Sequence, residues 1–155
     1  MKTKKLFNKK FYALTLTLIL VISSCMTAFA ETRYSKVSTT DGKTSVYNTI
    51  TASPDSITVF TSTEPGTLMI DNIYVIIVQC KVLKTTTGET TTMNVYCNKR
   101  CTDRTYSYGF DVVPSDLSYT GVDVLEFLQI IDASIYTNFL NGSYLTTEML
   151  NISVN

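Results

Sequence analysis

The chain has 155 residues, 13 basic and 13 acidic, and it contains no histidine. A chain without histidine lacks the commonest general base and every Ser-His or Cys-His nucleophile pair. It also has no Gly-x-Ser-x-Gly motif and no glycine-rich phosphate loop, so the sequence predicts no catalytic residue, no cofactor and no metal ligands.

The first 30 residues have the pattern of an export signal. Residues 1–10 carry five lysines and no acid, and an apolar run follows over residues 11–22. Ala28-Phe29-Ala30 then supplies the small residues that a signal peptidase reads, so we predict cleavage between Ala30 and Glu31. The apolar run is shorter than the roughly 20 residues that span a bilayer, and no transmembrane segment is expected after the signal is removed.

A second reading of the same segment involves lipid. Ile22-Ser23-Ser24-Cys25 is similar to a bacterial lipobox, in which the cysteine is lipidated and becomes the mature N-terminus. Acyl chains on Cys25 would anchor the domain to the cell surface. Ala28-Phe29-Ala30 is the better-formed site, and isoleucine is a weak first lipobox residue. We therefore expect a secreted protein, with a lipid-anchored one as the alternative.

Removal of the signal leaves residues 31–155 as a single domain, with eight basic residues, thirteen acidic ones and a net charge of −5. That balance gives no basic footprint for nucleic acid. Five of the eight cations lie between Lys81 and Arg104, and every charged residue after Tyr106 is acidic. Such asymmetry would allow self-association, one copy meeting another head to tail, although solvated loops and a mildly acidic surface explain it equally well.

Short alternating segments separated by turn residues predict an antiparallel sheet protein. Asp41-Gly42 suits a hairpin turn, which would set Lys36 opposite Tyr47. Further breaks come at Ser53-Pro54-Asp55-Ser56 and at Glu64-Pro65-Gly66.

The segment over residues 73–83, Ile-Tyr-Val-Ile-Ile-Val-Gln-Cys-Lys-Val-Leu, is apolar at both alternating positions through Val78. This pattern is typical of a strand that is covered on both faces, and an exposed segment of this kind would invite aggregation. We therefore expect it at the centre of the fold. With seven or more short strands at regular turn spacing, we predict an all-β protein, an antiparallel β-sandwich built from hairpins.

Residues 122–140 are ambiguous between helix and strand. Apolar residues recur there at helical spacing, at Val124, Leu128, Ile131, Ile135 and Phe139. Many β-branched residues and the hairpin signal Asn141-Gly142 favour strands instead. We predict strands from Ala133 onward and keep a short helix around residues 122–132 as the alternative.

Three cysteines remain after the signal, in an exported chain where disulfides form readily. If Gly88-Glu89 forms a two-residue turn, the hairpin places Cys80 opposite Cys97 on one apolar face, within reach of a disulfide. We therefore expect a Cys80–Cys97 bridge, with Cys97–Cys101 as the alternative. A four-residue loop would keep the same faces but shift the register, and reduced cysteines packed in the core would form no bridge.

Tyrosines divide into two groups. Tyr106, Tyr108 and Phe110 alternate along one face of an amphipathic segment and are expected in the core. Tyr47 and Tyr96 each lie opposite a lysine on a polar face in the predicted pairing, so these two are the expected exposed contact residues.

The lack of catalytic residues favours a secreted, non-enzymatic module that binds an unknown protein or glycan at the cell surface. One alternative is a secreted antimicrobial or toxin-like polypeptide, which the acidic charge of residues 31–155 disfavours. The other is a histidine-free hydrolase, which needs two facing carboxylates in an open cleft. Asp111 and Asp116 flank a turn, yet nothing in the sequence singles out this pair.

Overall fold

The computed structural model describes residues 30–154. Over this range it contains eight strands and one short 3-10 turn, η1. Their bounds are β1 Glu31–Ser38, β2 Ser45–Ala52, β3 Ile57–Glu64, β4 Met69–Lys84, β5 Glu89–Cys101, β6 Ser107–Val112, η1 Pro114–Leu117, β7 Val122–Phe139 and β8 Tyr144–Ser153.

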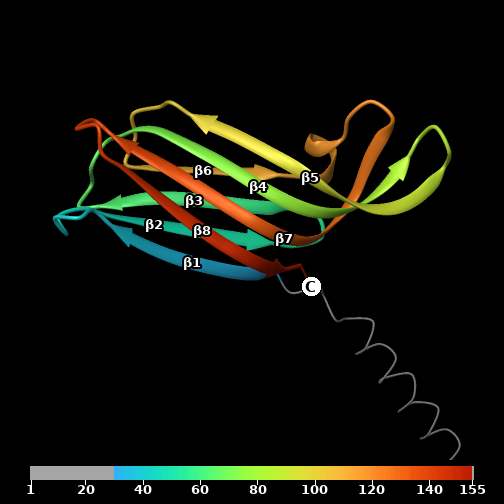
Figure 1. Cartoon of the computed structure of the whole chain (residues 1–155), viewed down its shortest axis with the longest axis horizontal. Helices are drawn as coiled ribbons and strands as arrows, with labels where there is room; N and C mark the ends of the chain where they lie inside the picture. The colour runs from blue at the N-terminus through green and yellow to red at the C-terminus, as the bar shows by residue number, and fades with distance from the viewer. Residues whose placement is uncertain (1–29, 155) are drawn as a thin grey trace, which may run out of the picture.

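The strands form two four-stranded antiparallel sheets, in the orders β1-β2-β3-β6 and β5-β4-β7-β8. The two sheets pack face to face as a sandwich (Figure 1). Four of the six strand pairs join strands that are consecutive in the chain, and the other two are β3–β6 and β4–β7. The predicted antiparallel β-sandwich is confirmed, and so is the pairing of Lys36 with Tyr47 in the β1–β2 hairpin.

Strand β4 occupies the centre of its sheet, between β5 and β7. One face is buried in the core, at Asn72, Tyr74, Ile76, Val78, Cys80 and Val82. The other face is only half-buried at Ile73, Val75 and Ile77, so the expected cover on both faces is wrong. No second layer lies over this face among the described residues; its partial burial comes from neighbours in the sheet, such as Tyr96 beside Ile77 and Tyr136 beside Ile73.

Strand β7 replaces the helix that the spacing allowed at residues 122–132, and that alternative is wrong. The pairing of β7 with β4 shifts register three times between Ile77 and Val82. At these bulges β7 spends three residues where β4 spends two, so its buried positions fall every third residue, at Val124, Phe127, Ile130 and Ala133. The helix-like spacing does not mark the buried face of this segment, because Leu128 and Ile131 are only half-buried.

The core between the sheets contains a chain of polar side chains among its aliphatic and aromatic residues. Tyr74 donates its hydroxyl to Thr61 Oγ1 at 3.2 Å, and Thr61 Oγ1 donates to Asn48 Oδ1 at 2.8 Å. Asn48 Nδ2 then donates to Thr147 Oγ1 at 2.9 Å. This polar chain joins β2 and β3 of one sheet to β4 and β8 of the other.

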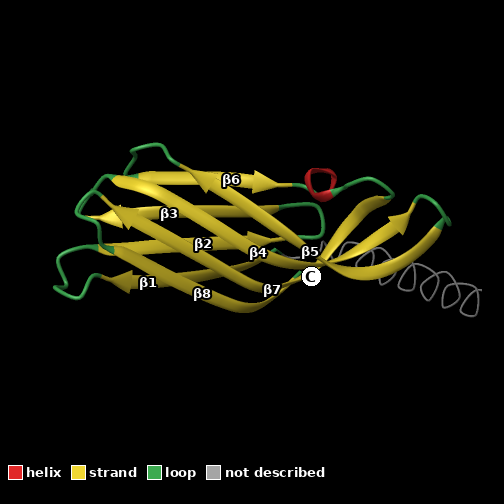
Figure 2. Ribbon diagram, turned by 45° about the horizontal axis from the view of Figure 1, so that its top comes forward, coloured by secondary structure: helices red, strands yellow, loops and turns green. Residues whose placement is uncertain are grey.

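The two long sides of the sandwich differ. On one side β1 lies against β8, and the Ser153 N–H donates to Glu31 Oε2 at 2.7 Å. On the other side, which we call the open side, the edge strands are β5 and β6, and they do not pair with each other. At one end of the sandwich, the β4–β5 hairpin and the start of β7 extend beyond the β1-β2-β3-β6 sheet (Figure 2).

The single helical turn within residues 30–154, η1, is not long and apolar enough to cross a membrane.

Candidate binding groove

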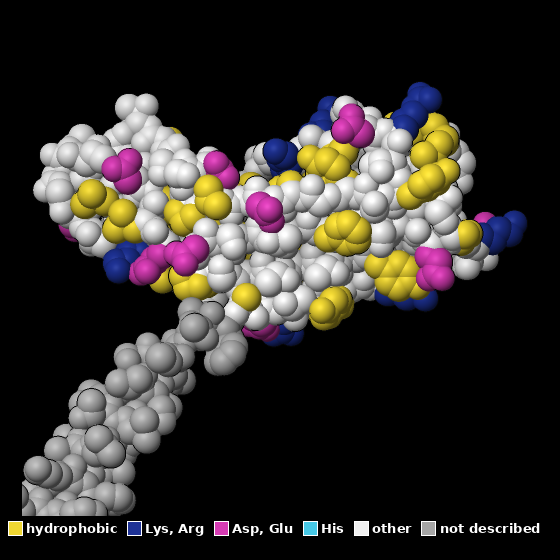
Figure 3. All heavy atoms as spheres, turned by 180° about the vertical axis from the view of Figure 1, so that it is seen from behind, with side chains coloured by type: hydrophobic (Ala, Val, Ile, Leu, Met, Phe, Trp, Pro, Cys, Tyr) yellow, Lys and Arg dark blue, Asp and Glu magenta, His cyan; other side chains and the backbone are white. Residues whose placement is uncertain are grey.

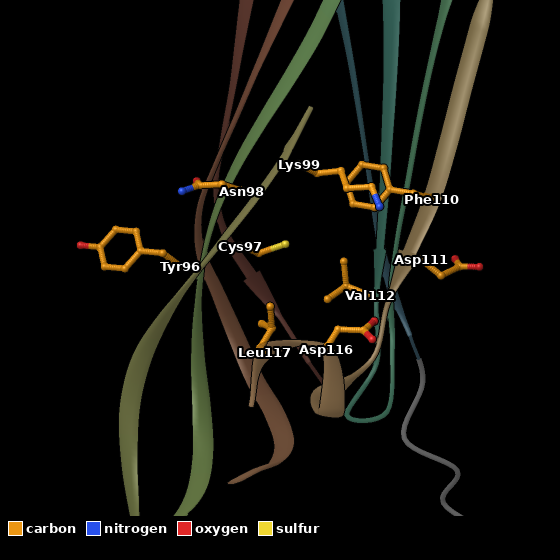
Figure 4. Close-up of a pocket in the computed structure, with 9 residues that line it drawn as sticks. All are labelled: Tyr96, Cys97, Asn98, Lys99, Phe110, Asp111, Val112, Asp116 and Leu117. Atoms are coloured by element: carbon orange, nitrogen blue, oxygen red, sulfur yellow. The ribbon is translucent and has the colours of Figure 1, made fainter. Parts of the chain in front are cut away.

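A groove of about 460 Å³ runs between β5 and β6 on the open side of the sandwich. Its lining residues are Tyr96, Cys97, Asn98, Lys99, Phe110, Asp111, Val112, Asp116 and Leu117 (Figure 4). Concave sites of this size are the usual position of ligand and peptide binding.

The groove exists because two edge strands meet without pairing. In the described part of the chain β5 pairs with β4 alone, and β6 with β3 alone. Turn η1 closes one end: Pro114 starts it, and the Val113 N–H donates to Asp116 Oδ2 at 3.0 Å. Leu117 from the same turn points into the groove (Figure 4).

Alternation along β5 decides which side chains face the groove. Cys97 and Lys99 point inward, whereas Tyr96 and Asn98 point to the outer face of the sheet (Figure 4). The Lys99 ammonium lies 5.7 Å from the centre of the Phe110 ring, a cation–π distance that reaches across the groove. Lys99 forms no ion pair among residues 30–154, so its charge is available to a ligand.

The two candidate carboxylates of the groove do not face each other. Asp111 lies on the outer face of β6, where Thr58 Oγ1 donates to its Oδ1 at 2.6 Å. Its carboxylate points away from the groove, whereas that of Asp116 points inward (Figure 4). These two residues therefore do not form the facing pair that a histidine-free hydrolase would need.

Cys97 lines the groove as a buried thiol. Burial raises its pKa, Lys99 acts in the opposite direction, and Asp116 adds to the rise. A thiol with a raised pKa stays protonated at neutral pH and is a poor nucleophile. We therefore assign Cys97 to packing.

The predicted disulfides are wrong, because all three cysteines within residues 30–154 are buried and unpaired. Cys80 lies opposite Met93, and Cys97 opposite Ile76. The hairpin loop has four residues, 85–88, which moves Cys97 four residues, about 13 Å, from Cys80 along the strands. Cys97 and Cys101 are equally far apart along β5, beyond the reach of a bridge.

The two tyrosines predicted as contact residues differ in the structure. Tyr47 is half-buried and engaged within its own sheet: its hydroxyl donates to Glu64 Oε2 at 2.6 Å, and Lys36 Nζ lies 5.1 Å above its ring. Tyr96 is 66% exposed, but it lies opposite Ile77 and not opposite the predicted lysine. Tyr96 remains a candidate contact residue.

The outer face of the β1-β2-β3-β6 sheet offers no continuous apolar surface. Figure 3 shows this face, on which isolated hydrophobic side chains are separated by polar ones. Tyr106, which we expected in the core, is 54% exposed because β6 begins only at Ser107. Tyr108 and Phe110 do pack against the core, through Tyr74.

The predicted processing sites lie at or beyond the start of the described range. Cys25 and the residues up to Phe29 are outside it, so the lipid alternative stays a prediction. Ala30 is exposed, and β1 begins at Glu31, the residue after the predicted cleavage site.

No group of three or more Asp, Glu, Cys or His side chains is close enough to hold a metal ion in the part of the chain that the structure describes. No protein-family model and no curated protein matches the sequence. Fold and site together define the class: an all-β, two-sheet sandwich with one open side.

Proposed function

We propose that residues 31–155 form an exported, non-enzymatic binding module that holds an extended polypeptide segment along the edge of β5. The observation that carries this proposal is that β5 is a long, regular edge strand with an uncharged central part. The strand has 13 residues, and its register with β4 is unbroken from Asn72–Cys101 to Lys84–Glu89. Residues 90–98 contain no charge and no proline.

Edge strands of this kind are normally protected. Natural proteins blunt them with charges, prolines, bulges or short length, because unpaired N–H and C=O groups recruit further strands. In the described residues β1 and β8 cover each other, and β6 has six residues and is followed by Pro114. Strand β5 has none of these protections over residues 90–98.

Addition of a strand to β5 would use both the free edge of β5 and the groove beside it. Main-chain hydrogen bonds to the edge would supply affinity, and alternate side chains of the partner would enter the groove and supply specificity. Inside the groove they would meet the apolar side chains of Phe110, Val112 and Leu117, with Lys99 on one wall and Asp116 at one end. An acidic side chain on the partner would match Lys99.

The test is to pan a phage-displayed library of random peptides against the exported chain and to map the best peptide by amide hydrogen exchange. We expect slower exchange for alternate residues of β5, because only every second N–H faces the free edge. Protection confined to another strand, or enrichment of no peptide, would overturn the proposal. Recognition of members of a glycan array without protection of β5 would replace the polypeptide by a glycan.

Two proline variants sharpen the test. Successive N–H groups in β5 alternate between the β4 ladder and the free edge, so Met93→Pro and Asn94→Pro remove one donor of each kind. The variant that removes the free-edge donor should keep its melting temperature within a few degrees and lose the peptide. Equal binding by that variant would contradict strand addition; if both variants unfold, the exchange experiment on the unmodified chain decides.

A further inference from the structure

We infer that the polypeptide that β5 takes is a second copy of this chain, paired antiparallel through β5 about a two-fold axis at Val95. This inference rests on the proposed function and names the partner of the same edge. It would join the two β5-β4-β7-β8 sheets into one continuous eight-stranded sheet.

The charges of β5 are self-complementary in that arrangement. The strand begins with an acid, Glu89, and ends with the cations Lys99 and Arg100, and no charge lies between them. Antiparallel pairing brings the beginning of one copy against the end of the other. With the axis at Val95, Lys99 lies opposite Thr91 of the second copy and diagonal to its Glu89, a distance that a lysine side chain spans.

The existing contacts leave these charges available. Lys99 has no acidic partner in the described part of the molecule, and Glu89 shares its carboxylate only with Lys84 at 3.3 Å, in an exposed pair. Exposed pairs of this kind contribute little free energy, so exchange of partners costs little. Arg100, by contrast, is held by Asp71 at 2.6 Å and is not needed for the pairing.

The side chains near the axis also match. Residues of equal parity meet, so Met93 faces Cys97 of the second copy on the inner side, and Asn94 faces its Tyr96 on the outer side. The exposed Tyr96 ring would then be covered by a neighbouring strand. The two open sides would meet, which places the groove of one copy against the groove of the other.

A two-fold pairing consumes the free edge in both copies. Because the same strand is used twice, the contact closes on itself, and no unpaired β5 is left to add a third copy. A dimer is therefore the expected end point, and not an open filament.

Sedimentation equilibrium of the exported chain over a range of concentrations tests this inference, with charge variants as the probe. Glu89→Lys sets like charges against each other at both symmetry-related contacts, and Lys99→Glu does the same with the opposite sign. Each should weaken the dimer by about tenfold, and added salt should weaken the unmodified dimer in the same direction. An equimolar mixture of the two variants should restore the dimer, because both contacts of the mixed pair are again attractive.

Glu148→Lys, an exposed charge change on β8, is the matched control and should leave the dimer unchanged. A second probe mixes Asn94→Cys with Tyr96→Cys, which should form an inter-chain disulfide faster than either variant alone. A dimer that is indifferent to the charge variants and to this cross-link would use another surface and would overturn the inference.

The outcomes separate the two proposals. A chain that stays monomeric at every concentration, yet binds a panned peptide along β5, contradicts the second copy and leaves the binding module standing. A monomeric chain in which the free-edge amides of β5 already exchange slowly without any peptide contradicts both the binding module and the second copy.

Discussion

Replacement of Asn48 by alanine should destabilise the fold by about 3 kcal/mol, because the amide is the central link of the polar chain between the sheets. Asn48 is 1% exposed, accepts from Thr61 at 2.8 Å and donates to Thr147 at 2.9 Å. Its removal leaves two buried hydroxyls each short of a partner, at about 1–3 kcal/mol apiece. For a domain of this size the loss corresponds to a fall in Tm of roughly 10 °C.

Urea unfolding followed by circular dichroism measures the change. The control is Thr40→Ala, an exposed threonine in the β1–β2 loop, which should stay within about 0.5 kcal/mol of the parent. Thr147→Val tests the link from its other end, and the double variant with Asn48→Ala should lose less than the sum of the single losses. A loss below about 1 kcal/mol for Asn48→Ala, or strict additivity, would show that the polar chain does not hold the sheets together.

Two further predictions concern the cysteines and the closed side of the sandwich. Residues 31–155 should show three reactive thiols when unfolded without reductant, and a mass deficit that reductant removes would contradict this. In the folded state Cys80 should alkylate slowly at about pH 8, because burial raises its pKa to about 11. The pKa of Glu31 is lowered mainly by the hydrogen bond from Arg33 and also by the one from the Ser153 N–H. The Glu31 carboxylate therefore stabilises the fold at pH values above its unfolded pKa of about 4.3. This stabilisation is lost as the pH falls through the folded pKa. Glu31→Gln should therefore lower the urea midpoint near neutral pH and flatten its decline on the acid side; parallel curves for the variant and the parent would refute the role of this contact.

Local signals in the sequence located two of the turns, but they gave the correct register only for the β1–β2 hairpin; in the β7–β8 hairpin Tyr144 pairs with Asn138 and not with Phe139. Asp41-Gly42 fixed the β1–β2 register, and Asn141-Gly142 correctly marked the turn between β7 and β8. Both depend on a few adjacent residues whose backbone preferences are strong; Gly42 and Gly142 adopt positive φ values of 68° and 81°. The all-β class was predicted from the same turn residues together with the alternation of apolar and polar side chains between them.

Two of the wrong predictions concern strand register: that of β4 with β5, which depends on the hairpin loop, and that of β4 with β7, which depends on bulges. The β4–β5 loop covers residues 85–88, so its midpoint lies two residues earlier than that of the predicted turn at residues 88–89; this preserved the faces of Cys80 and Cys97 but moved the two residues apart. The bulges in β7 converted a two-residue period into a three-residue one. Neither loop length nor bulge position is set by composition, because each depends on how well two strands pack once they are paired.

The polar chain and the groove could not be predicted from the sequence for a different reason. Asn48 and Thr147 are 99 residues apart, and no local pattern marks them as partners. The polar side chain of Asn48 looked like an ordinary strand residue because its burial depends on the opposite sheet.

Unequal strand lengths explain why the open side exists at all. On the side where β1 contacts β8, the two strands have similar lengths of eight and ten residues. On the open side, β6 has six residues and faces a β5 of thirteen, so it could not cover the longer edge even if the sheets moved together. Turn η1 and Tyr119, whose hydroxyl donates to Met93 Sδ, contact β5, but within residues 30–154 no strand pairs with its free edge. A strand of equal length and opposite direction would cover it, and a second β5 has both properties.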